Sequence, residues 1–314
     1  MRRAPYRIEG RTALVTGAAR GIGAEVAARL HARGANVALV GLEPERLEEL
    51  AARLGERCAW FEADVSDPAA IERAVSATVT RFGGLDVAVA NAGIHFVGAL
   101  ATAPVEQVER VLEVNLLGVW RTDRAVLPRI VERRGYLLNV ASLAAASHVP
   151  LMGPYAASKA GVEALTDCLR AETAATGARV GCAYFGFIDT DLVRASFAHP
   201  STRVIEAAMP AWLRRPAPPS EAVAAVERGI ERRARRVWAP RYVGGALLAR
   251  DVLQRVIEWR IARRASLSEA IRLAGTAAEG TAAPDPLLGV ATTDSTTGGA
   301  SDGPGTGAGP GLGE

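Results

Sequence analysis

The sequence has few cysteines and little net charge, and each shortage narrows the class of protein. The three cysteines, Cys58, Cys168 and Cys182, are odd in number and widely spaced, which excludes a disulfide framework and a clustered metal site. We expect buried thiols in a reducing compartment. A formal charge of +3 over 314 residues is too small to indicate nucleic-acid binding.

Membrane-spanning and secretory segments are also lacking. Residues 135–158 carry no charge, but proline, glycine and polar residues interrupt them, so we expect a buried strand and a loop there. The first seven residues include three arginines, and no apolar signal core follows them. These patterns predict a cytoplasmic protein.

Hydrophobic residues make up 49% and charged residues 23% of the chain, as in ordinary soluble globular proteins. Residues 275–314 differ, because they contain eleven glycines, four prolines, no aromatic residue and no Lys or Arg. We expect this tail to be disordered.

The first two thirds of the chain alternates short apolar runs with longer helical patterns. We expect strands at residues 12–16, 36–40, 58–62, 85–90, 136–141 and 179–184. We expect helices at residues 22–33, 44–54, 68–82, 104–131 and 155–175. The strand runs show little alternation, as in strands buried on both faces. The sequence therefore predicts an α/β fold with a doubly wound, Rossmann-like parallel sheet.

The pattern is looser after residue 184. We expect an irregular segment over residues 189–219, a helix over 221–235 capped by Ser220, and a short strand at 237–239. A long amphipathic helix is expected from about residue 245 to 273. We divide the chain into a Rossmann-like domain over residues 1–240, a basic C-terminal helical extension over 241–274, and the tail over 275–314.

The C-terminal extension is rich in arginine. Residues 226–264 contain eleven arginines and four acids, together with Trp238, Tyr242 and Trp259. One interpretation is a helix that lies on an anionic membrane. The interpretation we favour is a helix packed on its own subunit or on a second copy, with solvated arginines.

A glycine-rich turn, T-G-A-A-R-G-I-G, follows the first expected strand at residues 16–23 and opens a helix. Glycine allows a tight turn there and the close approach of a pyrophosphate, whose charge the helix N-terminus stabilises. The glycines fall at Gly17, Gly21 and Gly23, which differs from the G-x-G-x-x-G spacing. The position of the turn is what indicates nucleotide binding.

More motifs follow the later strands: Asp64-Val65 after the third, Asn91-Ala92-Gly93 after the fourth, Asn115 in a long helix, Ser142 after the fifth, and Tyr155-Ala-Ala-Ser-Lys159 opening the next helix. In this order, the motifs resemble those of the short-chain dehydrogenase/reductase family over about residues 8–240. The resemblance implies an NAD(P)(H)-dependent oxidoreductase that interconverts an alcohol and a ketone or aldehyde. It also implies a homodimer or homotetramer.

Tyr155 and Lys159 are four positions apart, so they share one helix face. A nearby ammonium and an oxidised nicotinamide can lower the pKa of a phenol from its usual value of about 10. Tyr155 would then move a proton near neutral pH while the cofactor moves hydride. Lys159 is the only lysine in the chain, and arginine cannot replace its compact charge without a change in geometry. We take this as a sign that the site is active.

The resemblance also implies roles for individual residues. Lys159 would hold the nicotinamide ribose, Ser142 would orient the substrate oxygen, and Asn115 would anchor a water relay. The predicted catalytic residues are Asn115, Ser142, Tyr155 and Lys159. The predicted cofactor contacts are Gly17, Arg20, Gly21, Ile22, Gly23, Asp64, Val65, Asn91, Gly93, Tyr155, Lys159, Ile188 and Thr190, with Asp64 on the adenine edge and Val65 packed on it. No metal site is predicted.

The choice between NADP and NAD depends on the end of the second strand. Gly41 stands where an acid would hold the adenosine ribose, so no carboxylate there repels a 2′-phosphate. Arg20 occupies a position where phosphate-preferring relatives carry a base. Leu42 offers no second cation, however, and Glu43 can reach a 2′-hydroxyl. We favour NADP, with NAD as the alternative.

Two positions depart from the family pattern: Phe185 replaces a proline before Gly186, and Ala90 replaces an asparagine. Four large apolar residues, Phe187, Phe197, Met209 and Trp212, favour a hydrophobic substrate.

The histidines have no ligand spacing, and we assign no role to His95 or His148, although both are expected on the catalytic face. The competing interpretation is a non-catalytic nucleotide-binding or membrane-surface sensor with the same fold.

Overall fold

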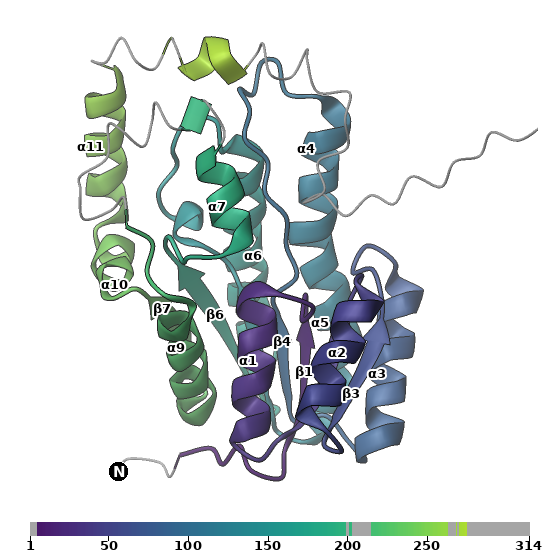
Figure 1. Cartoon of the computed structure of the whole chain (residues 1–314). Coiled ribbons are helices and arrows are strands. Elements are labelled where there is room, and N and C mark those ends of the chain that lie inside the picture. Colours follow the sequence, from purple (N-terminus) through teal and green to yellow (C-terminus); the bar gives the residue numbers. More distant parts are fainter. Residues whose placement is uncertain (1–4, 199–200, 203–214, 263–267, 269, 275–314) are drawn as a thin grey trace, which may run out of the picture.

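A computed structural model describes residues 5–198, 201–202, 215–262, 268 and 270–274 (Figure 1). The predicted tail, together with Met209 and Trp212, lies outside these residues.

A seven-stranded parallel sheet forms the centre of the described chain. Its strands are β1 (Thr12–Thr16), β2 (Asn36–Gly41), β3 (Cys58–Glu62), β4 (Val87–Ala90), β5 (Tyr136–Val140), β6 (Arg179–Phe185) and β7 (Arg236–Ala239). They follow the order β3-β2-β1-β4-β5-β6-β7. The chain starts in the middle, runs to one edge and returns to build the other, so the predicted doubly wound fold is confirmed. The strand order reverses between β1 and β4, which is where such sheets bind ligands.

Helices cover both faces of the sheet (Figure 1). One face carries α1 (Gly21–Ala32), α2 (Pro44–Leu54) and α9 (Pro219–Arg232). The other face carries α3 (Pro68–Phe82), α5 (Gly118–Glu132) and α6 (Gly153–Glu172). Strands β1, β4 and β5 are buried along their whole length, as their unbroken apolar runs predict.

The helix predicted over residues 104–131 contains an irregularity. It divides into α4 (Val105–Leu112), a π-helical stretch (Glu113–Leu117) and α5. π-Helical turns, which are wider than α-helical ones, are often found at functional sites. Here Asn115 lies in the wide turn and is completely buried.

Two predictions for the C-terminal part are wrong. The cap of α9 is Pro218 rather than Ser220, because Pro219 fits the first helical position. The long helix predicted over residues 245–273 divides into α10 (Arg241–Leu248) and α11 (Arg250–Ala262). Ala249 leaves helical geometry between them, with φ −105° and ψ 24°. Within the described part of the segment predicted to be irregular, residues Asp191–Ala198 form the helix α7.

Side chains of α11 hold the extension against the domain. Arg250 pairs with the buried carboxylate of Glu163 on α6 at 2.8 Å. Gln254 accepts a hydrogen bond from the backbone N–H of His148 at 2.8 Å and donates one to its carbonyl at 3.3 Å. The opposite face of the extension exposes Leu248 and Val252.

The cysteine prediction is only partly right. Cys182 is buried and Cys58 partly buried, but Cys168 is exposed on the outer face of α6. No helix in the described ranges is long and apolar enough to cross a membrane.

Candidate active site

The carboxyl ends of the central strands open into a cavity of about 1000 Å³. Thirteen of the predicted site residues line it: Gly17, Arg20, Gly21, Ile22, Asp64, Val65, Asn91, Gly93, Ser142, Tyr155, Lys159, Ile188 and Thr190. The other two, Gly23 and Asn115, are buried and do not line the cavity. The structure therefore brings together residues that are up to 173 positions apart in the chain.

The glycine turn forms one end of the cavity. Gly17 has a φ of +64°, which glycine adopts without strain. A Cβ on Gly23 would lie 2.2 Å from the carbonyl oxygen of Gly17, so only glycine fits there. Among the described residues, no side chain caps the N-terminus of α1. Its first N–H groups and the helix dipole therefore offer an anion site beside the cavity.

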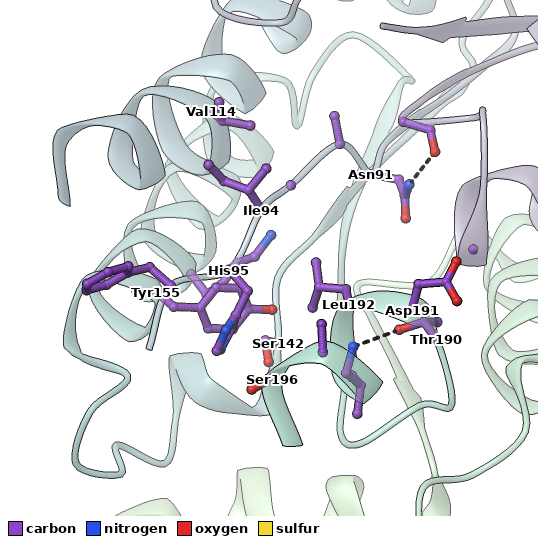
Figure 2. A pocket seen from close by; sticks show the side chains of 18 of the residues that line it. Asn91, Ile94, His95, Val114, Ser142, Tyr155, Thr190, Asp191, Leu192 and Ser196 are labelled. Atoms are coloured by element: carbon purple, nitrogen blue, oxygen red, sulfur yellow. Dashed lines mark hydrogen bonds between the residues drawn. The ribbon is translucent and has the colours of Figure 1, made fainter. Parts of the chain in front are cut away.

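Asn91 connects this turn to β4. Its backbone N–H donates to the Thr16 hydroxyl at 3.0 Å, and its side-chain amide donates to the Thr16 carbonyl at 3.0 Å. The amide also reaches the carbonyl of Gly17 at 3.4 Å (Figure 2). These bonds hold the ends of β1 and β4 in one arrangement at the point where the strand order reverses.

Ser142, Tyr155 and Lys159 meet at the centre of the cavity. The Nζ atom of Lys159 lies 5.7 Å from the centroid of the Tyr155 ring and donates to the carbonyl of Val140 at 2.9 Å. The Ser142 hydroxyl interacts with the Tyr155 hydroxyl and also contacts the carbonyl of Phe185 at 3.3 Å. A serine, a phenol and an ammonium thus face the same space.

Burial governs the protonation of these groups. Burial raises the pKa of Tyr155 above its ordinary value, and the hydrogen bond with Ser142 opposes this rise. Burial also lowers the pKa of Lys159 to about 8. The sequence predicted that the ammonium of Lys159 and an oxidised nicotinamide together lower the pKa of Tyr155. With Lys159 alone, burial leaves this pKa above its ordinary value. The ammonium lies beside the ring and points to Val140, so desolvation of the phenol outweighs its effect.

Asn115 holds the segment that follows β4 in place through hydrogen bonds to Ile94. Its side-chain oxygen accepts the N–H of Ile94 at 2.8 Å, and its amide donates to the Ile94 carbonyl at 2.9 Å. A Cβ on Gly93 would lie 3.2 Å from this oxygen and 3.4 Å from Nζ of Lys159. The π-helical turn therefore clamps the segment that follows β4. The predicted water relay at Asn115 stays a prediction.

Charged residues gather at the end of the cavity near β2. Glu43 forms ion pairs with Arg20 and Arg46, each with an N–O distance of 3.0 Å. Asp64 accepts the N–H of Ser66 at 2.7 Å and pairs with Arg110 at 3.1 Å. Burial raises the pKa of Asp64, but these bonds outweigh burial and leave that pKa below its usual value.

The opposite end of the cavity is mostly apolar, and its walls come from the segment after β4, from α7 and from the extension. Its apolar lining includes Phe96, Val97, Leu192, Val193 and Ala274. His95 is a polar exception, and its ring centroid lies 4.7 Å from that of Tyr155. Figure 2 shows these two rings side by side, with Ser142 close to them.

Some residues considered in the sequence do not reach the cavity. His148 is exposed, and Phe187 packs against Phe197 in a tilted arrangement with their centroids 5.1 Å apart. Neither phenylalanine lines the cavity. Phe185, which departs from the family pattern, continues β6 and pairs with Ala239, so the strand accommodates the change.

Comparison with known proteins assigns the chain to a family. A profile of short chain dehydrogenases matches residues 11–201. The chain belongs to the short chain dehydrogenase family. It is therefore an oxidoreductase of the short-chain type.

Relatives of this dehydrogenase are named for several reactions. It is 36% identical over 201 residues to 2-(R)-hydroxypropyl-CoM dehydrogenase from Xanthobacter autotrophicus, covering 62% of this chain and 80% of the relative. It is 35% identical to 3-oxoacyl-(acyl-carrier-protein) reductase from Vibrio cholerae. That match covers 60% of this chain and 78% of the relative.

A solved structure has a similar fold. The 3-ketoacyl-(acyl-carrier-protein) reductase from Brucella melitensis, complexed with NADH, matches with a TM-score of 0.67 at 27% identity. The match covers 74% of this chain and 97% of that chain. The matched family segment ends before α9, so α10 and α11 lie beyond it.

Arg46 and His95 line the cavity but were not among the predicted site residues. Arg46 lies one helical turn after Glu43, so the spacing could have placed it beside the same carboxylate. His95 follows Asn91-Ala92-Gly93 by two positions, on a loop that leaves the carboxyl end of a central strand. That position was visible in the sequence, but the contact with Tyr155 depends on the course of the loop.

Proposed function

We propose that this dehydrogenase interconverts an alcohol and a ketone or aldehyde, with a nicotinamide cofactor and with Tyr155 as the general acid or base. The observation that carries this proposal is the meeting of Ser142, Tyr155 and Lys159 beside an uncapped helix N-terminus. When bound, the cofactor supplies or accepts the hydride.

The residues present fit such a cofactor. The Gly17–Gly23 turn would hold a pyrophosphate, and the uncapped N-terminus of α1 would stabilise its charge. Lys159 would hold the nicotinamide ribose, and Ile188 and Thr190, which also line the cavity, would contact the nicotinamide part of the cofactor. Val65 and Asp64 also line the cavity, and they would contact the adenine.

In the reducing direction, Tyr155 donates its proton to the substrate oxygen as the carbonyl carbon receives hydride. Burial keeps the phenol protonated, which is the form that this step needs. The Ser142 hydroxyl stabilises the charge that develops on the oxygen. In the oxidising direction, the positive charges of Lys159 and of the oxidised nicotinamide favour the phenolate that accepts the proton.

Replacement of Tyr155 by phenylalanine tests this proposal. We expect kcat to fall by on the order of 10²–10⁴-fold, because the proton donor is lost, while nucleotide affinity changes little. The measurement follows nicotinamide absorbance over a panel of hydrophobic alcohols and ketones. A variant that turns over substrate as fast as the wild type would rule out the role of Tyr155.

We propose NADP(H) as the preferred cofactor. Arg20 and Arg46 both reach the rim where an adenosine 2′-phosphate would lie, and Arg46 supplies the second cation that Leu42 lacks. Guanidinium groups are well suited to phosphate. Their present partner is Glu43, so a 2′-phosphate would have to displace this carboxylate.

The same carboxylate favours the alternative, NAD(H), because Glu43 could instead accept the 2′-hydroxyl. Dissociation constants of both reduced nucleotides decide between the two cofactors. We expect Arg46→Ala to weaken NADPH by about 10-fold or more, with little change for NADH. We expect Glu43→Gln to tighten NADPH. Weaker NADH binding in Glu43→Gln, with NADPH unaffected in Arg46→Ala, would support NAD instead.

The competing function is a nucleotide-binding sensor without catalysis. It predicts tight nucleotide binding, no turnover of any alcohol or carbonyl compound, and no effect of Tyr155→Phe on binding. The predicted homo-oligomer is tested separately by light scattering of the full chain.

A further inference from the structure

His95 is the one histidine in the described chain that lines the cavity. Its ring packs against Tyr155 at an interplanar angle of 56°. None of the described residues forms a hydrogen bond with its two ring nitrogens, and neither nitrogen is shut off from the cavity. An imidazole with two available polar atoms therefore stands beside the proposed proton donor.

The loop that carries His95 is held at both ends. The buried amide of Asn115 binds both the N–H and the carbonyl of Ile94, the residue before it. Farther along, the N–H of Gly98 donates to the carbonyl of Leu151 at 2.9 Å. Leu151 lies four positions before Tyr155, so the loop is fixed relative to the catalytic helix. His95 is thus a pre-positioned group, which lowers the cost of ligand binding.

The imidazole is neutral at physiological pH, because burial lowers the pKa of His95 to about 4. A neutral imidazole has one N–H donor and one acceptor nitrogen. It can therefore hydrogen-bond to a carbonyl or a hydroxyl without placing a second positive charge beside Lys159.

The surroundings of His95 set the kind of ligand. Phe96, Val97 and Leu192 supply apolar walls, while Ser142 and Tyr155 are the polar groups at the proposed reacting oxygen. A simple hydrophobic ketone would occupy Ser142 and Tyr155 and would leave His95 without a partner. A pocket polar group without a partner costs binding free energy.

We infer that His95 is a specificity-determining residue that hydrogen-bonds to a second oxygen of the substrate, one or two carbons away from the reacting carbonyl. The substrate class is then a 1,2- or 1,3-dioxygenated carbonyl compound with an apolar chain. This inference rests on the proposed function, because it takes Ser142 and Tyr155 as the site of the reacting oxygen.

Matched substrates test the inference on the full-length enzyme with its nicotinamide cofactor. One pair is ethyl 3-oxohexanoate and nonan-4-one, which have the same chain length but differ in the ester oxygens. A second pair is hexane-2,3-dione and hexan-2-one. In at least one pair, we expect the wild type to prefer the dioxygenated compound by about 10-fold or more in kcat/KM.

Two variants separate hydrogen bonding from packing. His95→Phe keeps an aromatic ring against Tyr155 but removes both nitrogens, and His95→Gln keeps an amide donor and acceptor. We expect His95→Phe to abolish the preference, mainly through KM, and to leave the plain ketone within about 3-fold of the wild type. His95→Gln should retain part of the preference. His148→Gln is the matched control, and it should change nothing because this side chain is exposed outside the cavity.

Equal losses on both members of each pair would overturn the inference, because His95 would then act only by packing on Tyr155. An unchanged preference in His95→Phe would overturn it too. Affinities of the same pairs for the enzyme–nucleotide complex are measured in parallel, by quenching of nucleotide fluorescence. If no compound is turned over, the proposed function fails, and the affinity ratio in His95→Phe still decides the role of His95.

Discussion

The two ends of the cavity are built in different ways. The end proposed for the nucleotide has a backbone frame, made by the glycine turn and the open N-terminus of α1 and held by the amide of Asn91, with charged side chains at its rim. The substrate end consists of side chains from distant segments, such as His95, Leu192 and Ala274. The backbone geometry can be predicted from glycines that are close together in the sequence, whereas a wall of side chains depends on how remote segments pack. A change confined to one end should leave the other end unaffected, so each end serves as a control for the other.

Lys159 lies between the two ends, and its replacement by arginine should have the largest effect. The Nζ atom donates to the carbonyl of Val140 and lies beside Gly93, and a planar guanidinium cannot replace this compact group without a change in geometry. We expect kcat to fall by about 10³-fold. Steady-state turnover and nucleotide affinity, measured together, check this prediction, and a loss of less than about 10-fold would contradict it.

The pH profile of carbonyl reduction adds a second readout for the same variant. Burial lowers the pKa of Lys159 to about 8, so the ammonium is lost as the pH rises through this value. Burial keeps the pKa of Tyr155 above its ordinary value, so the phenol stays protonated there. The wild-type rate should therefore fall above about pH 8. The residual rate of Lys159→Arg should show no such fall, because a guanidinium stays charged.

Gly23→Ala acts on the nucleotide end alone. The new Cβ would lie 2.2 Å from the Gly17 carbonyl oxygen, so the turn must open. We expect nucleotide affinity to fall by about 30-fold and the protein to lose about 1–3 kcal/mol of stability. Gly245→Ala in α10 is the matched control, since nothing lies within 4 Å of its Cβ. An unchanged nucleotide affinity in Gly23→Ala would show that the turn does not hold the cofactor.

Ala274→Leu acts on the substrate end. Ala274 is 3% exposed and packs beside Ala99 and Leu151 at the rim of the cavity. A larger side chain should narrow the apolar end, so we expect KM for a bulky ketone to rise about 10-fold while nucleotide affinity stays the same. Ala69→Leu, at an exposed position of α3, is the control. Equal effects on substrate and nucleotide would mean that the two ends are not separate.

Arg250→Gln should have the smallest effect and tests whether α11 supports the substrate end. It removes one ion pair from the buried carboxylate of Glu163, which keeps its hydrogen bond from the Tyr184 hydroxyl at 2.9 Å. We expect a loss of about 1–2 kcal/mol in the free energy of unfolding and a KM about 3-fold higher for substrate. Thermal unfolding and kinetics measure both. A rise in the nucleotide dissociation constant without a change in KM would contradict this prediction, because α11 would then support the nucleotide end.

Much of the fold could be predicted from the sequence, because the signals are local. The runs that became β1 and β3 have the predicted bounds, and Pro44 and Pro68 mark the starts of two helices. The break at Ala249 has no such signal, since neither glycine nor proline stands there. It coincides with the contact between Arg250 and Glu163, which are 87 positions apart.

The site likewise has features that local sequence spacing predicts and features that depend on the packing of remote segments. Motif spacing was sufficient to bring Ser142, Tyr155 and Lys159 together, because Ser142 directly follows β5 and the other two lie in the first turns of the next helix, α6. The balance between burial and charge at the Tyr155 phenol could not be predicted from a spacing of four residues. The ring contact of His95 likewise depends on the clamp that a π-helical turn places on Ile94.

The scarcity of lysine gives this enzyme a built-in reporter. Reductive methylation with ¹³C-formaldehyde modifies primary amines only, so apart from the α-amino group it can label a single side chain, that of Lys159. The dimethylamine resonance of Lys159 would then report the titration of this amine. It would also shift when a ligand binds at either end of the cavity.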